Sequence, residues 1–200
     1  MRAWTLFVIL LGVLFLCTPC RAADVTKSLT VVFGHEGGLQ CESADPGNWT
    51  GGKVGLGRHG CTKYGIATNT YPREDIKNLT LARAGMLYKR DFWNPLHLTE
   101  FKSQGLATET FDTAVNMGLG TSANFHLRLI NILGPAHYKL NGRLNSEQVE
   151  WINKLTKKKV NRVAYWKMLN VLQGERYILI MEKNPNMTRY SNSWYSRVGD

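Results

Sequence analysis

Acidic residues are scarce in this sequence. Its 15 Asp and Glu face 25 Lys and Arg, which gives a formal net charge of +10 and an isoelectric point of about 9.6. Such a balance favours an anionic partner, whether nucleic acid, anionic lipid or an anionic cell envelope. No internal repeat or low-complexity linker divides the 200 residues. The length therefore suits one domain with a core, or one domain with a small helical extension.

Charge is also absent from the stretch between Ala3 and Cys20, which is mostly apolar and follows Arg2. Small residues precede a cleavage point after Ala22, and this pattern is typical of a secretory signal peptide. The run of 18 residues is also near the lower limit for a membrane-spanning helix. Residues 1–22 are therefore predicted to be a signal peptide or a signal anchor. Because an exported protein rarely meets nucleic acid, we expect the envelope as partner and no nucleic acid.

Cysteine is rare, and two of the four cysteines, Cys17 and Cys20, would leave with a cleaved signal peptide. The remaining pair, Cys41 and Cys61, would lie in an oxidising compartment, which favours a disulfide. That bond would close a loop of about 20 residues and stabilise the fold by about 3 kcal/mol. Free thiols, and zinc held with the nearby histidines, are the alternatives, although the spacing fits no standard zinc finger. We expect no metal.

Apolar periodicity predicts a mainly α-helical chain. Asp24 and Thr80 are placed to cap two helices, and Asn145 with Gln148 fits a capping box. A loop region rich in glycine is expected from about residue 39 to 68, with short strands near residues 63–67. Helical segments are predicted from Asp24 to about Glu36, from Thr80 to about Phe92, from about residue 106 to 117, around residues 125–133, from Asn145 onward, and from about residue 157 to 182.

Glu36 stands at the end of the first predicted helix, followed by Gly37 and Gly38. Two glycines can stop a helix because they tolerate a left-handed turn. The negative end of the helix dipole disfavours ionisation there, and partial burial would raise the pKa of Glu36 further. A carboxylic acid that stays protonated near neutral pH is what glycosidic bond cleavage needs as general acid. The alternative is a surface glutamate before a turn.

The sequence contains one partial match to a nucleotide-binding motif, and the match is incomplete. Gly47 and, five residues later, Gly52-Lys53 mimic a phosphate-binding loop, but Val54 stands where that loop needs Ser or Thr for magnesium. Neither the preceding strand nor the following helix is signalled. We therefore expect no nucleotide and no other cofactor.

Further motifs follow Glu36 in a fixed order. They are Asp45-Pro46-Gly47, Thr62-Lys63-Tyr64-Gly65-Ile66, and Phe111-Asp112-Thr113-Ala114-Val115-Asn116-Met117-Gly118. In this order and spacing the sequence closely resembles glycoside hydrolase family 108. These are N-acetylmuramidases found as phage endolysins and as relatives that assist protein secretion in bacteria. The resemblance runs from about Leu29 to Val198.

The resemblance implies a mainly α, lysozyme-like fold with a small β and loop region near the active site. It implies a catalytic domain over residues 24–135 and a helical C-terminal region over residues 136–200 that could bind peptidoglycan. The activity would be hydrolysis of the β-1,4 bond between N-acetylmuramic acid and N-acetylglucosamine. With the signal segment, this predicts a monomeric endolysin in the periplasm that lyses the wall, with a transient inner-membrane tether as an alternative.

The family's catalytic residues map onto Glu36, Asp45 and Thr62. The stretch between Asp45 and Thr62 is longer than in compact members, so Thr50 is a rival for the threonine role. A threonine that holds water favours inversion over retention.

Tyr64, Trp93 and Asn116 suit stacking on sugar faces and hydrogen bonds to acetamide groups, with core packing as the alternative for the two aromatic residues. Two other functions stay open. One is a non-catalytic wall-binding or secretion-assisting protein, and the other is a membrane-permeabilising cationic protein.

Overall fold

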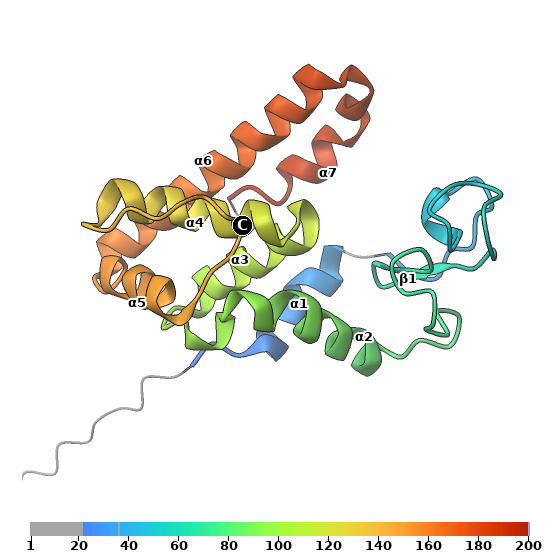
Figure 1. Cartoon of the computed structure of the whole chain (residues 1–200), viewed down its shortest axis with the longest axis horizontal. Coiled ribbons are helices and arrows are strands. Elements are labelled where there is room, and N and C mark those ends of the chain that lie inside the picture. The colour runs from blue at the N-terminus through green and yellow to red at the C-terminus, as the bar shows by residue number, and fades with distance from the viewer. Residues whose placement is uncertain (1–21, 36, 200) are drawn as a thin grey trace, which may run out of the picture.

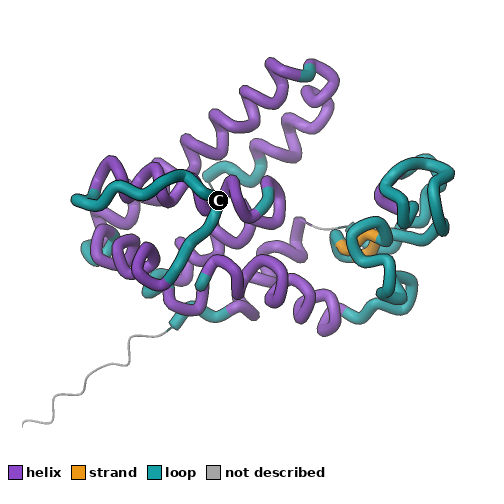
Figure 2. Tube along the Cα trace, in the orientation of Figure 1, coloured by secondary structure: helices purple, strands orange, loops and turns teal. Residues whose placement is uncertain are grey.

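The computed structural model describes residues 22–35 and 37–199, and Figures 1 and 2 show that most of this part is helical. Its sheet consists of β1 (Thr62–Lys63) and β2 (Ile66–Ala67), which pair antiparallel. The mainly α fold expected from the sequence is thereby confirmed. The helices are α1 (Val25–His35), α2 (Leu81–Tyr88), α3 (Gln104–Met117), α4 (Leu119–Leu133), α5 (Ser146–Leu155), α6 (Lys159–Lys183) and α7 (Ser191–Tyr195).

Side-chain caps begin several helices as the sequence predicts. The Asp24 carboxylate accepts a hydrogen bond from the backbone N–H of Thr26 at 2.9 Å, before α1. The Thr80 hydroxyl accepts one from the N–H of Arg83, before α2. Asn145 and Gln148 form a reciprocal capping box at the start of α5. These contacts satisfy backbone donors that have no partner inside the helix.

The core forms around α3, which packs against α1 on one side and α4 on the other. Phe111 of α3 is fully buried and lies edge-on to Trp93. Residues of α5 and α6, among them Ile152 and Tyr165, belong to the same cluster of buried side chains. The helices after residue 136 thus share their core with the helices before it.

A polar stripe on α3 holds the C-terminal part in place. Glu109, Asp112 and Asn116 recur at helical spacing, so they lie on one face of α3. Glu109 accepts a hydrogen bond from the indole of Trp166 at 2.9 Å, and Asn116 accepts one from the Tyr177 hydroxyl at 2.7 Å.

The middle member of the stripe, Asp112, binds the guanidinium of Arg197 at 2.6 Å. Both side chains of this ion pair are nearly buried. Removing one partner of such a pair typically destabilises a protein by about 3–5 kcal/mol, because a charge is then left buried without compensation.

Residues 37–79 form a lobe beside the helical body, and Figure 1 shows it at the opposite side from α5. Turns dominate this lobe. The β1–β2 hairpin turns through Tyr64 (φ 52°) and Gly65 (φ 71°). Two successive residues with positive φ define the type I′ turn, which matches the twist of a two-residue hairpin. The motif Thr62-Lys63-Tyr64-Gly65-Ile66 therefore encodes this hairpin.

No helix within the described residues is long and apolar enough to cross a membrane. The apolar run assigned to a signal peptide or anchor, residues 1–21 in the main, lies outside the described residues.

His126 of α4 is buried in the body beside Tyr165. Its Nδ1 lies 3.0 Å from the Tyr165 hydroxyl and its Nε2 lies 2.8 Å from the Thr110 hydroxyl. Burial lowers the pKa of His126 to about 3, because the charged ring would lose its hydration. The ring is therefore neutral in the folded protein, whereas in the unfolded chain it takes up a proton near pH 6.5.

His126 should make the protein less stable in mild acid. Between about pH 6.5 and pH 3 the unfolded chain binds one more proton at this site, so the free energy of unfolding should fall by up to about 1.4 kcal/mol per pH unit. Denaturant unfolding measured from pH 7 to pH 4 tests this. His126→Gln should flatten the slope, whereas His137→Gln, at an exposed histidine, should leave it unchanged. Identical slopes in both variants would contradict the assignment.

Candidate active site

Asp45 lies in the lobe, where its carboxylate is fixed by two hydrogen bonds. Oδ1 accepts from the backbone N–H of Gly47 at 2.8 Å, which caps a short 3-10 turn over Pro46–Asn48. Oδ2 accepts from the side-chain amide of Gln40 at 2.6 Å. Proline at the first position of the turn supports this geometry because its φ is already set. The Asp45-Pro46-Gly47 motif is thus a device for orienting a half-buried carboxylate.

Asn48 is fully buried, and its side chain links Gln40 to Thr62 by hydrogen bonds. Its amide nitrogen donates to Gln40 Oε1 at 2.8 Å and to the carbonyl of Glu42 at 2.9 Å. Its Oδ1 accepts from the Thr62 hydroxyl at 2.9 Å. A continuous chain of hydrogen bonds therefore runs from Asp45 through Gln40 and Asn48 to Thr62.

The direction of these hydrogen bonds limits what Thr62 can do. Its single hydroxyl proton points to Asn48, so the oxygen keeps only its acceptor capacity. A water molecule bound there would have to donate a proton to Thr62. Such a water presents its own lone pairs for attack, as a nucleophile must.

Backbone hydrogen bonds also join the Gln40 segment to the Thr62 segment. Gln40 and Thr62 exchange two backbone hydrogen bonds, of 2.9 Å and 2.8 Å. A cysteine adjoins each of these residues: Cys41 follows Gln40, Cys61 precedes Thr62, and the two cysteines form a disulfide. This bond uses both thiols of the alternative zinc set. It also closes the loop that carries Asp45 and Asn48.

Thr50 has a different role in the lobe. Its hydroxyl accepts a hydrogen bond from the backbone N–H of Arg58 at 2.9 Å. Gly57 packs so closely against Thr50 that a Cβ there would clash with this hydroxyl. Thr50 therefore ties together the glycine-rich segment, and Thr62 is the threonine that joins the Asp45 network.

Glu36 lies outside the described residues. The chain on both sides of it is described: α1 ends at His35, and the Gly37 carbonyl accepts a hydrogen bond from the N–H of Tyr64 at 3.1 Å. Tyr64 is half-buried, its ring lies 6.1 Å from that of Phe33, and its carbonyl accepts from the Tyr88 hydroxyl. Tyr64 thus joins the lobe to the helical body.

Trp93 is a correction to the predicted substrate-binding set. Its side chain is 1% exposed, its indole N–H donates to Thr99, and its ring packs edge-on against Phe111. A sugar cannot stack on a ring that has no free face, so core packing accounts for this residue. Asn116 is half-buried, and its Oδ1 is engaged by Tyr177.

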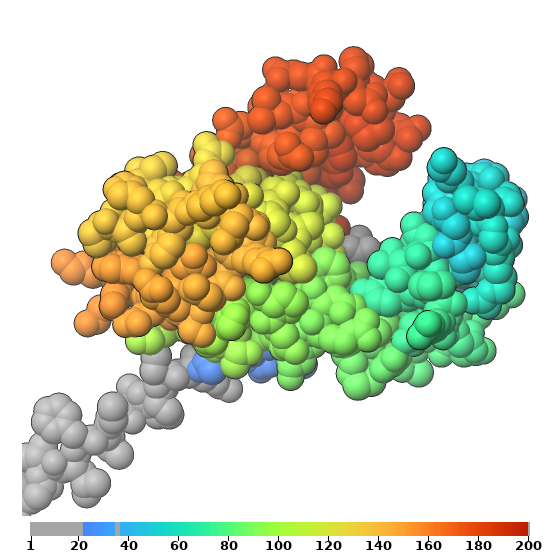
Figure 3. Space-filling model, in the orientation of Figure 1, coloured from blue at the N-terminus to red at the C-terminus, as the bar shows by residue number. Residues whose placement is uncertain are grey.

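The lobe and the C-terminal helices border a hollow in the molecular surface. Figure 3 shows the lobe on one side of this hollow and the end of α6 with α7 on the other. The lobe that carries Asp45 and Thr62 is therefore one wall of an open cleft. Open clefts of this kind accommodate extended ligands such as polymers.

Gln40 and Asn48 are the site residues that sequence reasoning missed. Asn48 follows Asp45-Pro46-Gly47 directly, and asparagine after a turn usually indicates a solvent-exposed cap. Only its complete burial shows that it links two other side chains. Gln40 gave no signal in the sequence.

Comparison with known proteins agrees with the motifs. The family model described as glycosyl hydrolase 108 matches residues 29–118. No curated protein matches the chain. The solved structure of SagA from Brucella abortus is similar, with a TM-score of 0.61 and 19% sequence identity over 87% of this chain and 88% of that chain. At this identity the likeness shows a shared fold.

Loss of the Cys41–Cys61 disulfide should destabilise the lobe. In the chain-entropy model, opening a loop of 20 residues lowers the free energy of unfolding by about 3 kcal/mol. The double variant Cys41→Ser and Cys61→Ser, measured by denaturant unfolding against the native protein, tests this. Reduction of the native protein with a thiol reductant should lower the stability in the same way. Equal stability of the oxidised, reduced and double-variant proteins would show that the disulfide does not hold the lobe.

Proposed function

We propose that the protein is an N-acetylmuramidase of glycosyl hydrolase family 108, whose family model matches residues 29–118. It would hydrolyse the β-1,4 bond between N-acetylmuramic acid and N-acetylglucosamine in peptidoglycan. The observation that carries this proposal is the hydrogen-bonded chain from Asp45 to Thr62. The family match contains every residue of that chain and also Glu36.

Glu36 is the proposed general acid. It follows the last residue of α1, where the helix dipole disfavours a negative charge. A protonated carboxyl group at this position would give its proton to the oxygen of the leaving sugar. The ring left behind develops positive charge, and a carboxylate such as Asp45 stabilises that charge electrostatically.

Asp45 and Thr62 would position the attacking water. The water donates one proton to Thr62, whose own proton is committed to Asn48, and the other to the Asp45 carboxylate. Asp45 then takes up that proton as general base while the water oxygen attacks the sugar. Gln40 and Asn48 hold the two groups in a fixed relation, so their role is positioning.

Export is part of the proposal. Residues 1–22 would direct Sec-type translocation to the periplasm, as a cleaved signal peptide or a transient tether to the inner membrane. A disulfide persists in that oxidising compartment. After cleavage the basic residues fall from 25 to 23 through loss of Arg2 and Arg21, so the net charge falls from +10 to +8. That charge suits attraction to the anionic wall, and lysis of the wall by a monomeric phage endolysin is the proposed outcome.

The proposed domain division has residues 24–135 as the catalytic part and residues 136–200 as a helical part that contacts peptidoglycan. The polar stripe of α3 supports a close association of the two, because its three residues all bind side chains from beyond residue 160.

Glu36→Gln should remove activity and keep the fold. An amide cannot donate the proton, and general acid catalysis typically contributes about 10²–10⁴-fold to the rate. Release of soluble fragments from purified murein measures the effect, and mass analysis should find reducing muramic acid ends in the native digest. Glu42→Gln makes the same change at an exposed residue of the lobe and should keep full activity.

Near-native release by folded Glu36→Gln would overturn the assignment of the acid. Anhydro ends would indicate a lytic transglycosylase, and binding of murein without release would indicate a wall-binding module.

The products should show inversion. An inverting enzyme separates its two carboxyl groups by about 6.5–9.5 Å to admit a water, whereas a retaining enzyme keeps them about 5–5.5 Å apart. Thr62 has a task only if a water is held. Proton NMR of fresh product should therefore detect the α-anomer first. Early appearance of the β-anomer would make Asp45 a nucleophile instead.

A further inference from the structure

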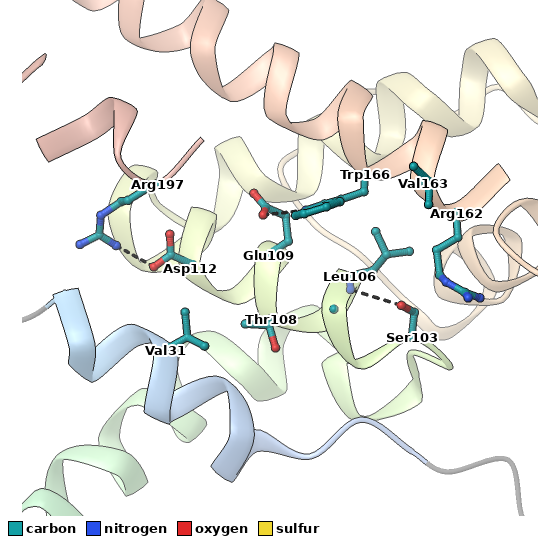
Figure 4. A pocket seen from close by; sticks show the side chains of 11 residues that line it. Val31, Ser103, Leu106, Thr108, Glu109, Asp112, Arg162, Val163, Trp166 and Arg197 are labelled. Carbon is teal, nitrogen blue, oxygen red and sulfur yellow. Dashed lines mark hydrogen bonds and ion pairs between the residues drawn. The ribbon is translucent and has the colours of Figure 1, made fainter. Parts of the chain in front are cut away.

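A second cavity lies away from the predicted catalytic residues. It is a groove of about 470 Å³ between α1, α3 and α6. Figure 4 shows Val31 reaching into it from α1, Leu106 from α3, and Val163 and Trp166 from α6. Val31 and Val163 are each about two-fifths exposed. The walls are thus apolar, and the groove is within the size range of pockets that bind small ligands.

The two ends of this groove differ in charge. At one end lie the carboxylates of Glu109 and Asp112, with Arg197 bound to Asp112 (Figure 4). At the other end lie Ser103 and Arg162. A ligand with one negative group would therefore place that group at the Arg162 end.

The Arg162 end adjoins a basic pocket of about 420 Å³, since Ser103 and Arg162 line both spaces. The basic pocket has four cationic side chains against the single carboxylate of Glu150, which leaves an excess of three positive charges. Glu150 is paired with Lys154 at 2.9 Å. The remaining cations are Lys102, Lys157 and Arg162.

We propose that the groove and the basic pocket together bind a single-chain anionic amphiphile, such as a lysophospholipid of the cell envelope. Its acyl chain would lie against Val31, Leu106 and Val163, where burial of apolar surface is favourable. Its phosphate would lie at Lys157 and Arg162, which are phosphate-binding side chains. Each part of the ligand thus meets a surface of matching chemistry, and the shared residues join the two surfaces.

This proposal is independent of hydrolase activity, since none of the proposed catalytic residues lines either space. Its test is a binding measurement, so failure of one proposal leaves the other standing.

Titration calorimetry on the full chain tests the site, with lysophosphatidylglycerol below its micelle concentration as probe. Lysophosphatidylcholine has the same chain with a zwitterionic head, and glycerol phosphate has the anion without the chain. We expect lysophosphatidylglycerol to bind at least about tenfold more tightly than either, because only it satisfies both surfaces.

Two variants separate the contributions of charge and chain. Lys157→Glu should weaken lysophosphatidylglycerol binding about tenfold and leave lysophosphatidylcholine unchanged. Its control is Lys158→Glu, the same change at the adjacent lysine, which lines neither space. Val163→Asn should weaken both lipids about fivefold. Its control is Val160→Asn, at a valine that is 71% exposed and outside the groove.

Three results would overturn the proposal. Equal effects of the variants and their controls would show that the site is not used. Glycerol phosphate binding as tightly as lysophosphatidylglycerol would reduce it to a plain phosphate site. Binding to phosphatidylglycerol vesicles that is unaffected by Val163→Asn, with no binding of the monomeric lipid, would show adsorption of the basic surface to a membrane. Thermal unfolding of each variant confirms that it is folded.

Discussion

A side-chain amide that has no contact with water must find its hydrogen-bond partners inside the protein. Asn48 finds them in Gln40, in the Glu42 carbonyl and in Thr62. The surrounding lobe has almost no regular secondary structure. Its fold is therefore stabilised by these side-chain hydrogen bonds rather than by the backbone hydrogen bonds of a large sheet. If any partner moved, a buried donor or acceptor would be left unsatisfied, at about 1–3 kcal/mol each. The lobe is therefore held in one arrangement, and Asp45 and Thr62 are held with it.

The helices could be predicted because the signals for them are local. Caps at Asp24, Thr80 and Asn145 act over three residues, and apolar periodicity reports the buried face directly. The role of Trp93 could not be predicted in this way, since an aromatic residue with polar neighbours in the sequence can either pack in the core or stack on a sugar ring. Its burial depends on Phe111, which is distant in sequence.

The Asp45 network could be predicted only at its two ends. Asp45 and Thr62 belong to motifs, whereas Gln40 and Asn48 are polar residues in a glycine-rich loop whose burial depends on how that loop closes. The pairing of Asp112 with Arg197 spans 85 residues, and no local pattern reports such a contact. The assignment of Glu36 as the general acid depends on its sequence motif alone, since Glu36 lies outside the described residues.

The family match ends at residue 118, yet the structure makes the later helices part of the same body. Three polar residues of α3 that would be unfavourable in a core become acceptable because each has a partner from α6 or the C-terminal tail. Removing that region would take away these three partners of the stripe. The C-terminal part is therefore a structural requirement of α3.

The two halves of the proposed chemistry are on different elements. In the sequence Glu36 directly follows the last residue of α1, whereas Asp45 and Thr62 are in the lobe. The internal network of the lobe fixes Asp45 relative to Thr62 but does not reach the body. Several contacts do reach it. The Tyr64 carbonyl accepts a hydrogen bond from the Tyr88 hydroxyl, the Tyr71 hydroxyl donates to the Asp91 carboxylate, and Glu74 pairs with Arg83 of α2. The placement of the lobe against the helical body is therefore set by these contacts and by the hairpin turn at Tyr64, rather than by the hydrogen bonds of Asp45.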